Sequence, residues 1–141
     1  MVVFNTTFLD REEVNEMNGL VGKPFPLLTK IKLGGVGSRR MIIHNVSENF
    51  KSLLNVVSDI NYVNIELRPN GIIVRLTQQL NRFSWVIPYY KLSIFNADYF
   101  SIHSDGSYIQ LVKSKNSSVS KKFLQNLMFL KATSNSSYEV K

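Results

Sequence analysis

Hydrophobic and polar residues alternate along the middle of the chain, from Tyr62 to Val112. Val63, Ile65 and Leu67 are separated by polar residues, which is the period-two pattern of a half-buried β-strand. The next four residues, 68–71, are Arg-Pro-Asn-Gly and have the composition of a β-turn. The pattern therefore predicts a strand that ends in a tight reversal of the chain.

After this turn we expect the chain to return along the same sheet. Ile72, Val74 and Leu76 would then lie on the same face as the apolar residues of the first strand. The register is open by one residue, because Ile73 is also apolar and a glycine bulge at Gly71 would shift the pairing. A third strand follows, with Phe83, Trp85 and Ile87 on one face.

Pro88 interrupts the alternation of the third strand. After it the apolar residues fall at Tyr90, Leu92 and Ile94, so the apolar phase has moved by one residue. A proline lacks the N–H that a ladder needs, and one extra residue re-aims every later side chain. We therefore interpret Pro88 as a bulge or an edge bend.

The last predicted hairpin turns at Asp105-Gly106, a dipeptide that favours a two-residue turn matching strand twist. If the hairpin closes there, Ile102 faces Ile109, and apolar residues meet apolar residues. The other expected pairs are Phe100 with Leu111, His103 with Tyr108, and Ser101 with Gln110.

Short helices are expected before the sheet. Asp10 can cap a helix, with Glu13 completing a capping box and Gly19 as the stop. A second short helix begins near Leu27 and ends at the glycine pair 34–35. The segment that follows, up to Arg40, is rich in glycine and basic residues, and we interpret it as a flexible connection.

Two further helices are predicted from apolar stripes. Residues 41–44 form a short strand, and a helix follows with Phe50, Leu53, Leu54 and Val57 on one face, ending at Asn61. The C-terminal helix runs from about Val119 to Lys131, and residues 132–141 are expected to be a frayed tail. Its apolar stripe consists of Phe123, Leu124, Leu127 and Met128.

Together these elements predict an α+β fold. We expect a bent antiparallel sheet or partly open barrel of about six strands, packed by the C-terminal helix. Residues 65–73 and 84–90 resemble a family of small uncharacterised bacterial proteins with a pleckstrin-homology-like fold. The resemblance implies that residues 41–131 form such a domain, with residues 1–40 as a dependent N-terminal helical extension. It implies no activity.

The chain has 141 residues, the size of one domain, and it contains no cysteine. Disulfides, thiolate metal sites and thiol catalysis are therefore excluded. The first residues lack the basic lead of a secretory signal, and no apolar run is long enough to span a bilayer. These features predict a cytoplasmic protein.

The net charge of +7 is unevenly distributed. Residues 23–40 and 113–131 contain basic residues and no acidic ones, so each segment would attract polyanions. The glycine-rich residues 34–40 are the best candidate for a loop that binds phosphate, but they lack the GxxxxGK[ST] spacing and a flexible loop is the favoured interpretation. The candidate anion-binding residues are Lys30, Lys32, Arg39, Arg40, Lys113, Lys115, Lys121 and Lys122.

No catalytic, metal or cofactor site is predicted. Ser101, His103 and Asp105 alternate on one strand face, but residues two apart lie about 7 Å apart, too far for a catalytic relay. A metal site built from His44, His103 and Asp105 has no supporting spacing. Most aromatic residues are expected in the core, and the two expected to be exposed are Tyr89 and Tyr108.

These observations favour a non-enzymatic binding module. It would hold a protein or peptide partner, or an anionic lipid headgroup, with its basic segments supplying long-range attraction. The alternative is a nucleic-acid-binding protein that uses residues 23–40 and 113–122. An enzyme is the third hypothesis, because no acid–base constellation is visible.

Overall fold

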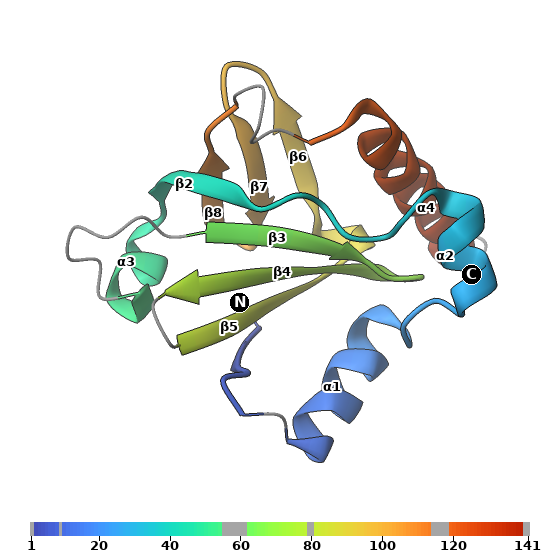
Figure 1. The fold of residues 1–141 in the computed structure, drawn as a ribbon, viewed down its shortest axis with the longest axis horizontal. Coiled ribbons are helices and arrows are strands. Elements are labelled where there is room, and N and C mark those ends of the chain that lie inside the picture. The colour runs from blue at the N-terminus through green and yellow to red at the C-terminus, as the bar shows by residue number, and fades with distance from the viewer. Residues whose placement is uncertain (1, 9, 55–61, 79–80, 114–118, 140–141) are drawn as a thin grey trace.

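The computed structural model describes residues 2–8, 10–54, 62–78, 81–113 and 119–139 (Figure 1). Within these ranges the strands form a single antiparallel sheet of eight strands. They are β1 (Val3–Asn5), β2 (Met41–Val46), β3 (Tyr62–Leu67), β4 (Gly71–Gln78), β5 (Asn81–Pro88), β6 (Ser93–Asn96), β7 (Phe100–Ser104) and β8 (Ser107–Leu111). The helices are α1 (Arg11–Val21), α2 (Leu27–Leu33), α3 (Glu48–Leu54), α4 (Lys121–Glu139) and the 3-10 helix η1 (Tyr89–Lys91).

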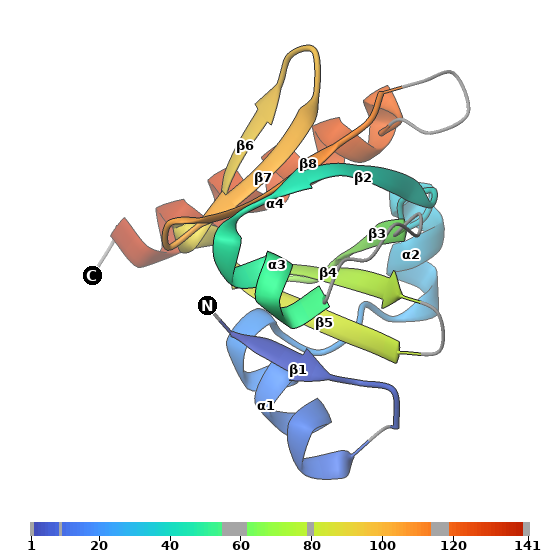
Figure 2. The same ribbon diagram turned by 90° about the vertical axis from the view of Figure 1, so that its left-hand side faces the viewer.

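The sheet bends at β2, which joins its two halves (Figure 2). The strand order is β1-β5-β4-β3-β2-β8-β7-β6, so β1 and β6 are the edges and the described strands do not close into a barrel. The pairing of β2 with β8 shifts register between Ile43 and Asn45. Such an irregularity lets a strand change direction while it keeps both neighbours.

The main core lies between the two halves of the bent sheet. Ile65 of β3 and Ile109 of β8 belong to the same buried cluster, although they lie on opposite sides of β2 in the sheet order. Phe123 and Leu127 of α4 complete this cluster. The predicted α+β class, antiparallel sheet and packing helix are therefore confirmed, whereas the expected number of about six strands was too low.

The β3–β4 hairpin has the register expected from the alternation. Leu67 pairs with Ile72 and Ile65 pairs with Val74, so no bulge intervenes. Ile73 is buried on the opposite face, where it packs with Met17 of α1. Ile73, which is apolar at a position where the alternation predicts a polar residue, thus marks a second, smaller core on the outer face of the sheet.

The segment around Pro88 differs from its prediction. Pro88 is the last residue of β5, and the 3-10 helix η1 follows it directly. The side chain of Tyr89 is buried and that of Tyr90 is exposed. The expected continuation of a strand with Tyr90 facing inward was therefore wrong, because the 3-10 turn places Tyr89 in the core instead.

The N-terminal helices begin as predicted, but α1 ends later. Asp10 caps α1, and its Oδ1 accepts the N–H of Glu12 at 3.0 Å. The helix continues through Gly19 to Val21 and stops at Gly22, whose φ is 91°. Gly34 ends α2 in the left-handed conformation, as expected.

The connection after α2 is held against β3 and is not a free loop. The N–H of Leu67 donates to the carbonyl of Val36 at 2.7 Å, and the N–H of Ser38 donates to the carbonyl of Ile65 at 2.8 Å. The hydroxyl of Ser38 also accepts the N–H of Ile65 at 2.8 Å. The prediction of a flexible connection was therefore wrong for residues 36–38.

The C-terminal helix is longer than predicted. α4 continues past Lys131 to Glu139, so the expected frayed tail was wrong up to that residue. Of the predicted apolar stripe, Phe123 and Leu127 are buried, Leu124 is half-buried and Met128 is exposed. The predictions for Val57 and Asn61 lie outside the described residues. Among the described helices, none has the length and apolar character needed to cross a membrane.

Candidate anion-binding site

The outer face of the β3–β5 part of the sheet has an apolar end and a polar end. At the apolar end, α1 covers Ile73 and Val86. At the polar end an open pocket of about 900 Å³ lies over the sheet. Its lining consists of Thr6, Thr7, Phe8, Arg40, Asn64, Arg75, Leu76, Thr77, Arg82 and Phe83.

Three arginines line this pocket from separate parts of the chain. Arg75 comes from β4, Arg82 from β5, and Arg40 from the residue before β2. The guanidinium of Arg40 lies over the ring of Tyr62, 5.1 Å from its centroid. Among the described residues, no acidic side chain lines the pocket, and neither Arg40 nor Arg82 forms an ion pair.

One wall of the pocket is the short segment after β1, which is fixed to β5. The N–H of Thr6 donates to the carbonyl of Arg82 at 2.8 Å. The hydroxyl of Thr7 accepts the N–H of Arg82 at 3.0 Å and donates to Asn5 Oδ1 at 2.7 Å. The backbone of Arg82 is therefore held in place, while its side chain is exposed to the pocket.

Arg75 is the partly neutralised member of the three. Its Nη2 lies 2.6 Å from Oε1 of Glu66, and Arg68 Nε donates to the other oxygen of this carboxylate. Burial alone would raise the pKa of Glu66, but the hydrogen bonds from Arg75 and Arg68 outweigh it and lower the pKa. Glu66 is therefore a carboxylate shared by two guanidinium groups, and a net positive charge remains at the pocket.

Arg68 does not line the pocket and instead joins two parts of the fold. Its side chain is buried, and Nη1 donates to Asn18 Oδ1 at 2.8 Å and to the carbonyl of Gly22 at 2.9 Å. These bonds join the end of α1 to the sheet. Together with Glu66, Arg68 therefore links the α1 packing to the arginine pocket.

The structure divides the candidate anion-binding residues between different surfaces. Arg40 lines the pocket, and the exposed Arg39 precedes it without lining it. Lys113 donates to the carbonyl of Ala97 at 2.7 Å, and Lys115 lies outside the described residues. The remaining candidates lie on α2 and at the start of α4: Lys30, Lys32, Lys121 and Lys122.

The two basic segments meet at one edge of the molecule. Asn126 Nδ2 of α4 donates to the carbonyl of Leu33 of α2 at 2.7 Å. Lys122 Cε lies 3.4 Å from the position that a Cβ would occupy at Gly34. The start of α4, with Lys122, therefore lies beside the end of α2, and none of the lysines of the two helices lines the arginine pocket.

Sequence reasoning missed Arg75 and Arg82 as site residues. Both sit at the outward positions of strands whose inward positions are apolar, as Arg75 does between Val74 and Leu76. The signal was the alternation itself, which places both arginines on the same face in neighbouring strands. Arg75 pairs with Ser84, and Arg82 pairs with Thr77. Thr77 follows Arg75 by two residues on β4, so the two arginines lie on the same face of the sheet.

The aromatic candidates have different positions from those expected. Tyr89 is buried because its ring enters the core after η1 begins, and burial raises the pKa of its phenol. The prediction that Tyr89 is exposed was therefore wrong. Tyr108 is half-buried and stacks on His103, with ring centroids 5.6 Å apart.

The hairpin of β7 and β8, which contains Ser101 and His103 on β7 and Asp105 in its turn, has the predicted register. Asp105 has a φ of 51° in the turn and forms an ion pair with Lys91 at 3.7 Å. No hydrogen bond found in the described part of the chain joins the three residues, and burial lowers the pKa of His103. Among the described residues, no three His, Cys, Asp or Glu side chains lie together in a group that could hold a metal ion.

Comparisons with models of protein families, with curated proteins and with solved structures found no match to this chain.

Proposed function

We propose that this protein is a non-enzymatic binding module that holds an anionic group in the pocket lined by Arg40, Arg75 and Arg82. The observation that carries the proposal is that three arginines from separate parts of the chain line one pocket, and that none of the described residues lining it is acidic. Guanidinium groups bind phosphate and carboxylate oxygens through paired N–H donors. The ligand class is therefore a phosphate or carboxylate, on a free molecule or on a lipid headgroup.

The polar residues around the arginines support the same proposal. Thr77 and Asn64 offer further donors from β4 and β3, and neither is fully buried. Arg40 is kept over Tyr62, so part of its conformational freedom is already restricted before a ligand binds. An oxyanion held by such groups would exchange water for charge-assisted hydrogen bonds.

We also propose that the fold belongs to the pleckstrin-homology superfold. A bent, open antiparallel sheet whose last helix fills the core supports this assignment. The position of α4 agrees with the arrangement that the sequence resemblance implies. The helical extension before β2 and the edge strand β1 would then be additions to that superfold.

The experiment is a titration with pyrophosphate followed by NMR chemical shifts of the full chain. Shifts are expected at Asn64, Thr77 and Arg82, and Arg82→Gln should weaken binding by about tenfold. The matched control is Arg11→Gln, which removes an exposed arginine of α1 outside the pocket. Equal affinity of the Arg82→Gln and wild-type proteins would contradict the proposal.

Two further ligands separate the sources of the anion. Vesicles that carry phosphorylated headgroups, compared with the same headgroups free in solution, distinguish a membrane-bound ligand from a soluble one. Duplex DNA tests the alternative of a nucleic-acid-binding protein. Tight DNA binding with a steep salt dependence, unaffected by Arg82→Gln, would favour that alternative.

A further inference from the structure

Helix α2 presents its apolar side chains to solvent. Leu27, Leu28 and Ile31 are 73%, 74% and 66% exposed, and no residue of the helix is buried. Isolated exposed apolar residues are common on protein surfaces, but three in one short helix form a patch. We call Leu27, Leu28 and Ile31 the α2 patch.

The lysines of α2 flank this patch on both sides. With about 100° of rotation per residue, the α2 patch covers about 100° of the helix surface. Lys30 then lies beyond one border of the patch and Lys32 beyond the other. The opposite side carries Thr29 and Leu33, which are half-buried against the protein.

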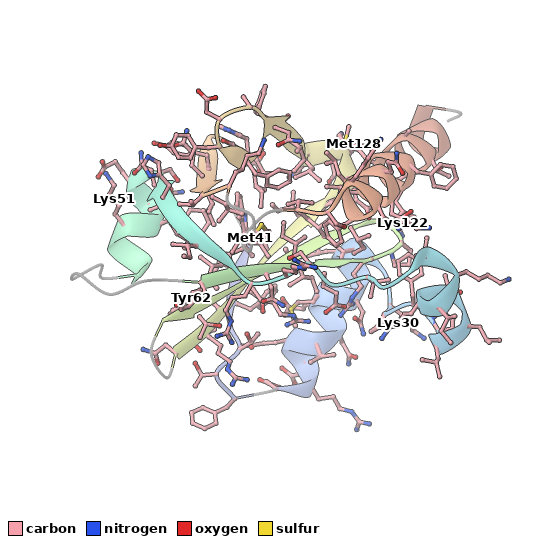
Figure 3. All side chains as sticks on the ribbon, turned by 45° about the horizontal axis from the view of Figure 1, so that its top comes forward. Lys30, Met41, Lys51, Tyr62, Lys122 and Met128 are labelled. Atoms are coloured by element: carbon pink, nitrogen blue, oxygen red, sulfur yellow. The ribbon has the colours of Figure 1, made fainter. Side chains whose placement is uncertain are left out.

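The opposite side of α2 is also the one that contacts α4. The carbonyl of Leu33 accepts the hydrogen bond from Asn126, and Lys122 lies beside Gly34 at the end of α2. Figure 3 shows Lys30 on α2 and Lys122 on the adjacent α4. The helix is therefore fixed with its apolar side outward, with Lys30 and Lys32 on it and Lys122 beside its C-terminal end.

No acidic residue occurs near the patch in the sequence. Between Glu16 and Glu48 the chain has five basic residues and no acidic one, and α4 carries no acid before Glu139. A protein partner with mixed surface charges would gain little from such a one-sided arrangement. A surface with an apolar interior beneath a uniformly negative layer would match both the α2 patch and the lysines beside it.

We propose that α2 docks this protein on an anionic membrane surface, with the α2 patch inserted among the lipid headgroups. The helix would lie in the plane of the interface, and Lys30 and Lys32 would extend their charged ends back to the headgroups. Lys122 would add a further contact from α4. This docking surface is separate from the arginine pocket and goes beyond the function proposed for it.

The test is sedimentation of the full chain with vesicles of phosphatidylcholine alone and of phosphatidylcholine mixed with phosphatidylserine. Wild-type protein should sediment with the mixed vesicles and much less with the neutral ones. Replacing Leu27, Leu28 and Ile31 together by Ser should weaken the binding by at least about tenfold, because it removes most of the apolar surface that is inserted. These side chains are exposed, so the folded state should survive, which circular dichroism checks.

A second variant tests the electrostatic half of the proposal. Lys30→Gln with Lys32→Gln should weaken binding to the mixed vesicles by about fivefold per lysine. Two controls should bind as the wild type does: Phe95→Ser, which removes an exposed apolar residue of β6, and Arg11→Gln, which removes an exposed arginine of α1 outside both the α2 patch and the pocket.

Two outcomes would overturn the membrane proposal. One is the absence of wild-type binding to the mixed vesicles. The other is unchanged binding of the triple Ser variant. If the wild type instead forms a dimer that the triple Ser variant abolishes, and binds no vesicles, the α2 patch is an interface between copies of the chain and the membrane proposal fails.

Discussion

The carboxylate of Glu66 lies 2.6 Å from the guanidinium of Arg75, on the outer face of the sheet. The second carboxylate oxygen of Glu66 accepts a hydrogen bond from Arg68, which is only 6% exposed. One acidic residue therefore balances a surface arginine and a buried one. The pocket, the sheet and the end of α1 are electrostatically connected through Glu66.

Glu66→Gln should destabilise the protein by about 3 kcal/mol, because a buried guanidinium loses its counter-charge. Urea unfolding followed by circular dichroism measures this change. The matched control is Glu48→Gln, which breaks an exposed pair with Lys51 at 3.2 Å. That change should cost less than about 0.5 kcal/mol. Equal effects of the two substitutions would show that the Glu66 pairs contribute no more than a surface pair.

Acid should weaken the protein through the same residue. The pKa of Glu66 is lower in the folded chain than its ordinary value of 4.5, so the folded state binds the proton less well than the unfolded state. The stabilising contribution is complete above the ordinary pKa and is lost as the pH falls through the folded pKa. Urea midpoints measured downward from neutral pH should therefore fall more steeply for the wild type than for Glu66→Gln.

His103 also contributes to the loss of stability in acid, at a higher pH than Glu66 does. Burial lowers its pKa from 6.5, so protonation also favours the unfolded state. Its stabilising contribution is complete above the ordinary histidine pKa and is lost as the pH falls through the lowered one. The contributions of Glu66 and His103 can be separated, because Glu66→Gln should leave unchanged the loss of stability that His103 causes at the higher pH.

Two glycines are expected to respond in opposite ways to the same substitution. A Cβ at Gly71 would lie 2.4 Å from the carbonyl oxygen of Ile87 and 2.4 Å from Val21 Cγ1. Gly71→Ala should therefore cost about 2 kcal/mol or more, because backbone and helix must move apart. At Gly19, inside α1, nothing lies within 4 Å of the added Cβ.

Gly19→Ala should accordingly stabilise the protein by about 0.5–1 kcal/mol, since alanine is the better helix former. Thermal unfolding of both variants checks the pair. A stabilising effect at Gly71 would contradict the close approach of α1 and β5 to this strand. A destabilising effect at Gly19 would contradict the continuation of α1 to Val21.

The hairpins were predictable from sequence because their information is local. The alternation of Val63, Ile65 and Leu67 and the Asp105-Gly106 turn each specify a register within a few neighbouring residues. A local signal was misleading at the end of α1, where Gly19 was expected to stop the helix. The helix continues past this glycine because Val21 packs in one buried cluster with Ile73. That contact joins residues far apart in the sequence and leaves no local signal.

The candidate site was harder to predict for the same reason. Arg40 was selected because it lies in a basic segment, whereas Arg75 and Arg82 have no basic residue near them in the sequence. Only the pairing of β4 with β5 and the return of β1 bring them together around one pocket. Of the lysines that form clusters in the sequence, Lys30 and Lys32 lie on α2 and Lys121 and Lys122 on α4, and none of the four lines the arginine pocket.

Tyr89 connects the β3–β4 turn with the C-terminal helix, and its removal gives the last prediction. Its hydroxyl donates to the carbonyl of Arg68 at 2.7 Å, and its own carbonyl accepts from Lys131 of α4 at 3.0 Å. Tyr89→Phe keeps the packed ring but leaves a buried carbonyl without this donor, which should cost about 1–3 kcal/mol. Tyr99→Phe, at a partly exposed ring stacked on His44, should change the stability by less than about 0.5 kcal/mol. Urea unfolding of the two variants measures the difference, and equal stabilities would mean that the Tyr89 hydroxyl does not support the turn.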